Sequence, residues 1–366
     1  MTVGYYSPLP PAPTGVADYA AGLLTQLRRL GDVRIAPRRC DVALYHLGNN
    51  RLHADIYRRA LEQPGVVVLH DAVLHHFFLG QLDCDEYIEE FVYNYGGWHR
   101  ELAADLWRSR ATSGSDPRYF EFPMLRRIAE RSRAIVLHNP AAARMVQRHC
   151  PGSPVFEIPH FYQPPEAMSE AELFRYRQQL GFETATTVFG TFGFLRETKR
   201  LLNVLEVFGA LRRELPNIGL LVAGAFVSGD LERAAKPLLA IPGVVCRPFL
   251  SARDLSIACA SVDAGINLRY PPAGETSGMV IRLMGLGKPV LLTDSEECSR
   301  FPEDGCLRVP AGLEERDSLW SHMVLLTSLP EVARAVGQRA AEHIRAHHGL
   351  DQIAQRYWDT LCGFCC

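Results

Sequence analysis

The sequence predicts an α/β protein with two domains, each built around a parallel sheet. Short apolar runs alternate with helical segments, the alternation stops at a stretch with linker composition over 160–172, and it then restarts. Alternating strands and helices are typical of parallel sheets with right-handed crossovers. A chain of 366 residues is long enough for two domains that each bury a core.

Apolar runs in the first half are expected to be strands. The run at 66–70 is continuous between Gly65 and Asp71, which is typical of a central parallel strand. The first helix is expected over about 15–30, where Gly31 ends it. The expected strands lie at 3–6, 42–45, 66–70, 134–138 and 155–158, and helices at 15–30, 52–62, in several pieces over 73–131, and after Asn139-Pro140.

The second half repeats the pattern after Pro164-Pro165. Strands are expected at 187–192, 220–223, 244–247, 262–267 and 290–293, with helices between them and further helices at about 313–328, 331–347 and 351–361. We therefore expect an N-terminal domain over 1–165, a C-terminal domain over 166–348, and a last helix within 349–366.

Composition excludes several classes of protein. The 47% hydrophobic and 22% charged fractions are ordinary for a globular protein, and a net charge of −2 gives no attraction to nucleic acid. No apolar run approaches the ~20 residues of a membrane span. The sequence begins with an apolar strand and shows no signal peptide, so we expect a cytoplasmic protein.

The ten cysteines are scattered through expected helices and strands, without paired metal-type spacing. In a cytoplasmic protein we expect reduced thiols. The cluster at the C-terminus offers three potential metal ligands but no fourth nearby. Its members are Cys362, Cys365 and Cys366.

The segment Gly-Glu-Thr-Ser-Gly at 274–278 carries the most chemical information. It reads as a loop that opens a short helix, which Thr276 or Ser277 can cap and Gly287 can end. The N–H groups and dipole of such a helix favour a phosphate, and the Glu275 carboxylate can accept hydrogen bonds from sugar hydroxyls. A nucleotide-sugar site needs both features. A capped helix with a solvent-facing glutamate is the alternative.

Residues that follow the expected strands are the other candidates, because ligands of parallel α/β folds lie at the carboxyl ends of strands. In the first half these residues are 7–15, 46–50, 70–71, 138–139 and 160. In the second half they are 193–200, 224–229, 248–251, 268–278 and 294–297. They are rich in glycine, histidine and aspartate, which a plain core does not require.

These stretches resemble glycosyltransferase family 4, whose members have the GT-B fold. Besides 274–278, the matching stretches are PPAPTGVADY at 10–19, LGNN at 47–50, VLHD at 68–71 and GFLRETKR at 193–200. The N-terminal stretches most resemble bacterial members that build surface polysaccharides. The resemblance implies two Rossmann-like domains facing a central cleft, with the C-terminal helix crossing back to the first domain.

The resemblance also implies a reaction. The family transfers a sugar from a nucleotide-diphosphate donor, bound mainly by the C-terminal domain, with retention of anomeric configuration. The acceptor, a glycan or lipid-linked glycan, binds mainly to the N-terminal domain. Front-face substitution is favoured, in which the departing phosphate oxygen helps to remove the acceptor proton. Neither a metal nor another cofactor is then expected.

Roles for individual residues follow from the same resemblance. Lys199, expected on a surface loop, would neutralise the donor diphosphate, which gains negative charge in the transition state. Glu275 matches the first glutamate of a paired-glutamate motif and would contact donor-sugar hydroxyls. The implied catalytic residues are His70, Asp71, Lys199 and Glu275. The implied donor-binding residues are Gly15, Gly193, Arg196, Lys199, Arg200, Phe249, Leu250, Glu275, Thr276, Ser277, Gly278 and Met279.

The chain departs from the family pattern at two positions. Phe194 stands where an arginine usually follows the loop glycine, and Arg196 or Arg200 could substitute for it. The second glutamate, which normally holds the ribose, is replaced by Leu283 or, in a shifted alignment, Arg282. The ribose-binding role is therefore left unassigned.

Histidines and glycines at strand ends complete the N-terminal part of the predicted site. Gly15 would let the backbone approach the phosphates and acceptor, and His70 would contact the transferred sugar through its backbone or ring. Asp71 could orient the acceptor. For His70 and Asp71 a purely structural role is the alternative, and His138 and His160 are interpreted as packed or polar-network histidines.

Two alternative functions use the same fold. A sugar-nucleotide epimerase would eliminate and re-add the nucleotide, but the acceptor-side loops at 7–15 and 47–50 would then serve no purpose. A non-catalytic nucleotide-sugar-binding subunit would be consistent with the missing second glutamate. The pair Asp83 and Asp85 resembles a metal-binding motif, but it is expected to start a helix, so we predict no metal site.

Arginine clusters bear on the expected partners, which are a nucleotide sugar and a glycan acceptor, without nucleic acid. A basic face could hold the enzyme peripherally at anionic lipid on the inner side of the cytoplasmic membrane. Interspersed carboxylates favour the alternative of solvated faces. The clusters are Arg28, Arg29, Arg34, Arg38 and Arg39, and Arg126, Arg127, Arg131 and Arg133.

Overall fold

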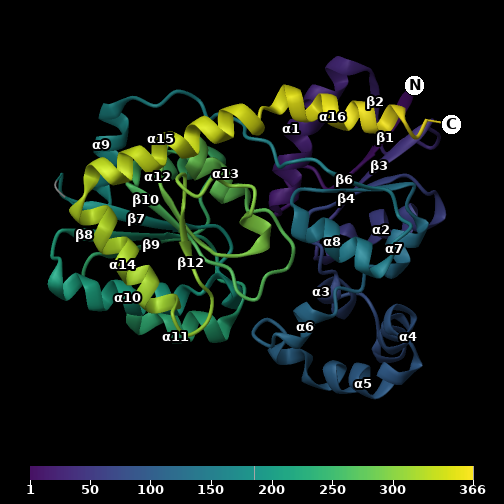
Figure 1. The fold of residues 1–366 in the computed structure, drawn as a ribbon, viewed down its shortest axis with the longest axis horizontal. Helices are drawn as coiled ribbons and strands as arrows, with labels where there is room; N and C mark the ends of the chain where they lie inside the picture. The colour runs from purple at the N-terminus through teal and green to yellow at the C-terminus, as the bar shows by residue number, and fades with distance from the viewer. Residues whose placement is uncertain (185, 366) are drawn as a thin grey trace. The chain divides into compact units, whose positions relative to one another are not determined.

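The computed structural model describes residues 1–184 and 186–365. Contacts between residues divide the chain into two compact units, which we describe separately (Figure 1). Unit 1 comprises Met1–Phe161, Pro271–Thr276 and His348–Cys366. Unit 2 comprises Tyr162–Tyr270 and Ser277–His347.

Unit 1 contains a six-stranded parallel sheet in the order β2-β1-β3-β4-β5-β6. Every residue of β3, β4 and β5 is buried, because helices cover both faces of a parallel sheet. The strand order reverses between β1 and β3, where ligands of such sheets bind. The strands are β1 (Thr2–Tyr6), β2 (Asp32–Ile35), β3 (Val42–Leu47), β4 (Val66–Leu69), β5 (Ala134–Leu137) and β6 (Val155–Glu157).

Helices connect most strands of unit 1, although β2 leads directly into β3, and the connection between β4 and β5 is expanded. This insertion has an aromatic core in which Tyr87, Phe91 and Tyr119 are fully buried, and Figure 1 shows α4, α5 and α6 away from the sheet. The helices are α1 (Gly15–Leu30), η1 (Arg51–His53), α2 (Ala54–Glu62), α3 (His75–Leu79), α4 (Cys84–Tyr95), η2 (Gly97–His99), α5 (Arg100–Ser109), η3 (Arg110–Thr112), α6 (Arg118–Glu121), α7 (Arg126–Arg131), α8 (Pro140–His149) and α16 (Leu350–Cys362).

The C-terminal helix α16 belongs to unit 1 and packs beside α1 (Figure 1). Its apolar residues, at helical spacing, join the core that α1 and β1 form. The Tyr357 and Tyr19 hydroxyls lie 3.0 Å apart. Gly31 ends α1, and a Cβ there would lie 2.1 Å from the Trp358 ring. A glycine at the end of α1 is therefore needed for α16 to approach.

Unit 2 contains a second six-stranded parallel sheet, in the order β12-β11-β10-β7-β8-β9, and the α/β architecture predicted from the sequence is confirmed. The strand order reverses between β7 and β10, so the loops after these strands flank the expected ligand position. The strands are β7 (Thr187–Phe192), β8 (Ile218–Ala223), β9 (Val244–Arg247), β10 (Ala264–Asn267), β11 (Val290–Thr293) and β12 (Leu307–Val309).

Helices of unit 2 connect its successive strands. Apolar faces of α10 and α14 join the core under β7 and β8. The helices are α9 (Glu170–Gln179), η4 (Glu197–Lys199), α10 (Leu201–Glu214), α11 (Gly229–Leu239), α12 (Ala252–Ser261), α13 (Gly278–Gly285), η5 (Glu296–Cys298), α14 (Glu315–Ser328) and α15 (Pro330–His347).

Three elements were not expected from the sequence. Strands β2 and β12 lie at sheet edges, where β2 buries only Val33 and β12 spans three residues. Short, charged edge strands lack the apolar run that marks a central strand. Helix α9 begins at Glu170 inside the stretch interpreted as linker, because Ser169 caps it and none of its residues is buried.

The segment Pro271–Thr276 groups with unit 1, although we expected it within a C-terminal domain over 166–348. The backbone explains this difference. The Ala72 N–H donates to the Ala273 carbonyl at 3.1 Å, and Asn139 Nδ2 donates to the Gly274 carbonyl at 3.0 Å. The loop is therefore hydrogen-bonded to the strand ends of the first sheet.

Candidate functional site

Lys199 lies at the carboxyl end of β7 in unit 2, beside Gly193. Its side chain is only 7% exposed, and its Nζ donates a hydrogen bond to the Phe192 carbonyl oxygen. Gly193 has a φ of +87°, and a Cβ there would lie 3.1 Å from Nζ of Lys199. Glycine therefore serves both the turn and the close approach of the ammonium group. The expectation that Lys199 is on an exposed surface loop was wrong, because the strand end buries it.

The N-terminus of α13 lies beside the same turn. A Cβ at Gly193 would be 3.9 Å from Cγ of Met279, in the first turn of α13. Ser277 occupies the N-cap position, yet its side chain caps no N–H, and its buried Oγ has no hydrogen-bond partner among the residues that the structure describes. Donors at a helix N-terminus without side-chain partners, next to an ammonium group, form an arrangement suited to phosphate.

The ends of α13 agree with the sequence prediction only in part. Gly287, with φ +74°, ends the helix as predicted, and the N–H groups of Gly287 and Lys288 donate to Met284 and Leu283. A side-chain cap by Thr276 or Ser277 is absent. Thr276 Oγ1 instead accepts a hydrogen bond from Asn139 Nδ2 at 3.0 Å.

Aromatic side chains follow two strands of the second sheet. The rings of Phe194, after β7, and Phe249, after β9, have centroids 6.1 Å apart and are tilted by 33°. Phe249 is 64% exposed, so much of its ring is accessible to solvent. The donor-binding role of Phe249 and Leu250 stays a prediction.

Arg196 and Arg200, which could replace the missing arginine, differ in their surroundings. Arg196 is exposed, with its guanidinium 5.9 Å from the Phe194 ring centre. Arg200 is bound through Nε to both carboxylate oxygens of Glu315, at 3.0 and 3.1 Å, and Glu315 is 1% exposed. A buried carboxylate needs such a partner. Arg200 therefore has a structural use, and a donor-binding role for either arginine stays a prediction.

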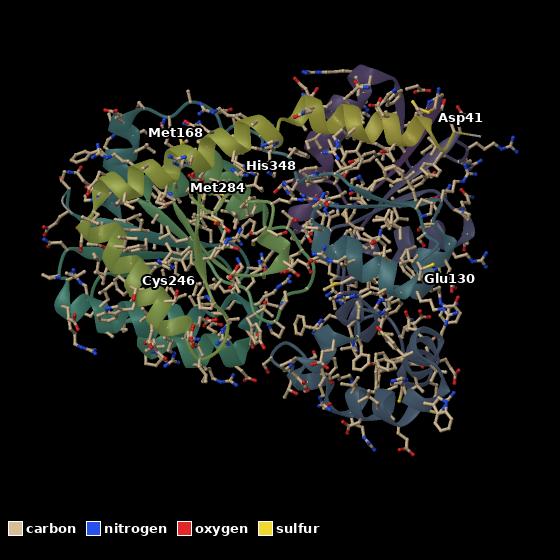
Figure 2. The ribbon with its side chains drawn as sticks, in the orientation of Figure 1. Asp41, Glu130, Met168, Cys246, Met284 and His348 are labelled. Atoms are coloured by element: carbon tan, nitrogen blue, oxygen red, sulfur yellow. The ribbon has the colours of Figure 1, made fainter. Side chains whose placement is uncertain are left out.

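Neither candidate for the second glutamate position offers a carboxylate. Leu283 is buried in the core of unit 2 against Gly265. Arg282 donates through Nη1 to the Ser256 hydroxyl at 2.9 Å. The neighbouring Met284, labelled in Figure 2, is also fully buried. This face of α13 is core, so it presents no acid that could bind a ribose.

In unit 1, the loop 271–276 brings Glu275 close to the end of β4. A Cβ at Gly274, whose φ is +69°, would lie 2.6 Å from the Ala72 side chain. Glu275 Oε2 accepts a hydrogen bond from the Ala273 N–H at 3.0 Å. Because Ala72 directly follows His70 and Asp71, these two residues and Glu275 belong to one local cluster.

Two asparagines that we had given no specific role support this cluster. Asn139 caps α8 through its Oδ1 and uses its Nδ2 to hold the loop 271–276. Asn49 donates its N–H to Asp71 Oδ2 at 2.8 Å and accepts from the Phe77 N–H at 2.7 Å. Their side chains link segments distant in sequence. The only sequence feature that pointed to these asparagines was their position in the strand-end stretches 47–50 and 138–139.

Gly15 is the first residue of α1, after the N-cap residue Thr14. It is exposed, and a Cβ there would have no neighbouring atom within 4 Å. The chain therefore leaves space beside Gly15, but no packing constraint requires the glycine. Its role in donor binding stays a prediction.

Histidines at neighbouring strand ends of unit 1 form a chain around His70. His46 Nδ1 lies 3.0 Å from His70 Nε2, and His138 Nε2 lies 3.3 Å from His70 Nδ1. Burial lowers the pKa of His46 to about 3 and that of His138 to about 4, and it lowers the pKa of His70 well below its usual range. These imidazoles are therefore neutral near pH 7.

The acidic pair at the start of α4 has a structural role. Asp83 is the N-cap residue, and it exchanges hydrogen bonds with Glu86 in a capping box. This confirms the predicted helix start. Among the described residues, no group of three or more histidine, cysteine or acidic side chains is arranged to hold a metal. Cys362 and Cys365 are exposed free thiols, and Cys366 lies outside the described residues.

Solved structures that match nearly the whole chain include glycosyltransferases. Sucrose-phosphate synthase from Thermosynechococcus elongatus matches with a TM-score of 0.69 at 12% identity, over 99% of this chain and 98% of that chain. HepE of Anabaena in complex with UDP-glucose matches with a TM-score of 0.66 at 13% identity, over 99% and 100%. The chain has the GT-B fold.

A third match is WaaG, a glycosyltransferase involved in lipopolysaccharide biosynthesis, with a TM-score of 0.63 at 15% identity over 99% of this chain and 100% of that chain. At such identities the likeness establishes the fold alone. No protein-family model matches the chain, and no curated protein sequence matches it. The GT-B fold implied by the sequence resemblance is thus confirmed, whereas donor, acceptor and stereochemistry are matters for proposal.

Proposed function

We propose that the protein is a retaining glycosyltransferase that moves a hexose-type sugar from a nucleotide-diphosphate sugar to a glycan or lipid-linked glycan. The observation that carries this proposal lies in unit 2, where Lys199 Nζ, the turn at Gly193 and the N-terminus of α13 lie close together. Within the described residues, the Ser277 hydroxyl at that N-terminus has no hydrogen-bond partner. All three follow β7 or β10, the strands that flank the reversal of strand order. Glycosyltransferases among the matching solved structures support the proposed sugar transfer.

The chemistry proposed for this site is stabilisation of a leaving group. As the bond between sugar and diphosphate breaks, negative charge accumulates on the diphosphate. An ammonium group and N–H donors already fixed at a strand end lower the energy of that state more than the energy of the ground state. Lys199 and the first turn of α13 would supply these groups, and Glu275 would accept hydrogen bonds from the donor sugar.

A panel of nucleotide sugars tests the proposal. Calorimetric titration identifies the base and sugar that bind, and product analysis with and without glycan acceptors follows for each binder. We expect one donor to bind and to lose its sugar only when an acceptor is present. Conversion of the donor without acceptor would indicate an epimerase, binding without turnover a non-catalytic subunit, and the absence of binding would refute the proposal.

We further expect transfer without a divalent metal. Lys199 and the α13 N-terminus provide positive charge for the diphosphate, and Asp83 is used as a helix cap. Initial rates should therefore be unchanged by excess EDTA. If EDTA abolishes activity and Mg²⁺ or Mn²⁺ restores it, a metal carries the charge that we assign to Lys199.

Contact with anionic lipid is proposed for the first arginine cluster only. Arg38 and Arg39 are exposed, next to the half-exposed Ile35 of edge strand β2. In the second cluster, Arg126 pairs with Glu130 and Arg127 with Glu90, which leaves less net charge for lipid. In the described part of the chain, no helix combines the length and apolar character needed to cross a membrane.

Liposome co-sedimentation measures this contact. We expect the protein to bind anionic vesicles at low salt and to be released at high salt, because each basic residue near the surface contributes about 1 kcal/mol that salt screens. The double substitution of Arg38 and Arg39 by glutamate should abolish binding, and the same change at Arg126 and Arg131 serves as the control. Equal binding by both variants would contradict the proposal.

A further inference from the structure

The sequence places a histidine at the same level of adjacent strands. Val-Leu-His ends two of the expected strands, at 68–70 and at 136–138. The register of β4 against β5 pairs Val68 with Val136, so two residues later His70 and His138 are neighbours on the same face of the sheet. On the other side of β4, His46 pairs with Val68 and shares that face. Sheet geometry alone therefore brings His46, His70 and His138 together.

The hydrogen bonds that link His46, His70 and His138 all run in one direction. His138 Nδ1 lies 2.9 Å from the Ile158 carbonyl oxygen, which can only accept, so Nδ1 carries the proton. In the neutral ring Nε2 is then an acceptor, and it receives the Nδ1–H of His70 at 3.3 Å. His70 Nε2 in turn receives the Nδ1–H of His46 at 3.0 Å. Both ring nitrogens of His70 are thereby occupied.

The two ends of this row of hydrogen-bonded histidines, at His46 and at His138, oppose the entry of a proton. His46 is 0% exposed, and its Nε2 is a buried atom without a hydrogen-bond partner among the described residues. Protonation there would create a charge with no partner. At the other end, the Ile158 carbonyl cannot take a proton from His138. His46 and His138 can therefore orient the His70 ring, but they cannot relay protons to or from it.

In the part of the chain that the structure describes, aromatic rings and imidazoles surround the His70 ring. Tyr19 of α1 packs edge-on against the ring, with centroids 4.9 Å apart. Imidazoles that approach from the adjacent strands are themselves neutral. The titratable and charged groups near His70 are Tyr19, His46, His53, His138 and His160, with Asp71 as its chain neighbour.

We propose that His46 and His138 are positioning residues that hold the His70 imidazole in one orientation, as the neutral Nδ1–H tautomer with both nitrogens occupied. This inference rests on the proposed function, because it gives the chain a purpose at a sugar-transfer site. Positive charge develops on the transferred sugar ring in such a reaction. A neutral, immobile ring avoids repulsion of that charge, and the His70 ring serves neither as general base nor as nucleophile.

Histidine NMR tests the chain itself, independently of any activity. In the full-length protein with ¹⁵N-labelled histidine, we expect His46, His70 and His138 to show a protonated Nδ1 and an unprotonated Nε2 at pH 7, unchanged down to pH 5. Single substitutions assign the signals. An Nε2–H form of His70, or an imidazolium that titrates between pH 5 and pH 8, would overturn the proposal.

Two substitutions at one position separate positioning from packing. His138→Gln can place an oxygen near the Nε2 position and keep an acceptor for His70, whereas His138→Asn can keep only the donor to Ile158. We expect His138→Asn to lower kcat on the order of 10- to 100-fold and to release the His70 tautomer, and His138→Gln to retain most of the activity. Equal kcat values and an unchanged His70 spectrum in both variants would overturn the proposal.

His75 supplies the matched control. It is also buried, its Nδ1 lies 2.9 Å from the Phe122 carbonyl, and its Nε2 lies 2.6 Å from the Tyr87 hydroxyl. His75→Gln and His75→Asn should lower thermal stability as the His138 variants do, without any change in kcat or in the His70 spectrum. If the wild type transfers no sugar, the proposed function fails. The tautomers measured by NMR then still decide whether His46, His70 and His138 are hydrogen-bonded as described.

Discussion

We expect Lys199→Ala to lower kcat by roughly 10²- to 10³-fold, which corresponds to about 3–4 kcal/mol of transition-state stabilisation. The reason is the position of Nζ at the end of β7, beside Gly193 and the first turn of α13. A fixed cation acts mainly on charge that develops during the reaction, so the loss should appear in kcat more than in KM. Steady-state kinetics with the donor identified by titration measures both constants.

The control for this variant is Lys236→Ala, on the exposed surface of α11, which should not change kcat. Because Lys199 is 7% exposed, circular dichroism and thermal melting must show that Lys199→Ala is folded. A folded Lys199→Ala protein with wild-type kcat would remove the diphosphate role from Lys199.

The second large effect is expected at Glu275. Glu275→Gln keeps an oxygen that can accept the hydrogen bond from the Ala273 N–H, so the loop 271–276 should retain its conformation. The variant loses the charge that strengthens hydrogen bonds to sugar hydroxyls. We expect kcat/KM for transfer to fall roughly 10- to 100-fold, while affinity for the free nucleoside diphosphate changes little.

Comparison with Glu275→Ala separates the carboxylate from the loop. The alanine variant also removes the acceptor for the Ala273 N–H, so it should be less stable than the glutamine variant. Calorimetric titration of the nucleoside diphosphate into both variants checks donor binding. If the bare diphosphate loses most of its affinity for the folded glutamine variant, Glu275 contacts the nucleotide and not only the sugar.

The sequence was sufficient for elements with a strong apolar pattern. Buried central strands such as β4 and β8 are continuous apolar runs, and Gly31 and Gly287 end helices where glycine was predicted to do so. Edge strands β2 and β12 were missed, because strands with one free edge carry charged residues. Helix α9 was missed because it buries no residue and so lacks an apolar stripe.

In the candidate site, too, residues within one local stretch were predicted, whereas contacts between distant segments were not. Gly193 and Lys199 were predicted from the stretch 193–200 and the α13 N-terminus from the stretch 274–278, and unit 2 brings them together. Partners that depend on tertiary contact were not predicted: Glu315 for Arg200, and Asn139 for the loop 271–276. In the sequence, the histidines that form this hydrogen-bonded row appear only as residues at the ends of expected strands, and strand register was required to join them.

Proton NMR of the reaction mixture tests retaining sugar transfer most directly. The donor that binds is incubated with a glycan acceptor, and the coupling constant of the anomeric proton is followed from donor to product. We predict a new glycosidic linkage with the anomeric configuration of the donor, together with one nucleoside diphosphate released for each sugar transferred. A product of inverted configuration, or an isomerised nucleotide sugar without a new linkage, would contradict the account.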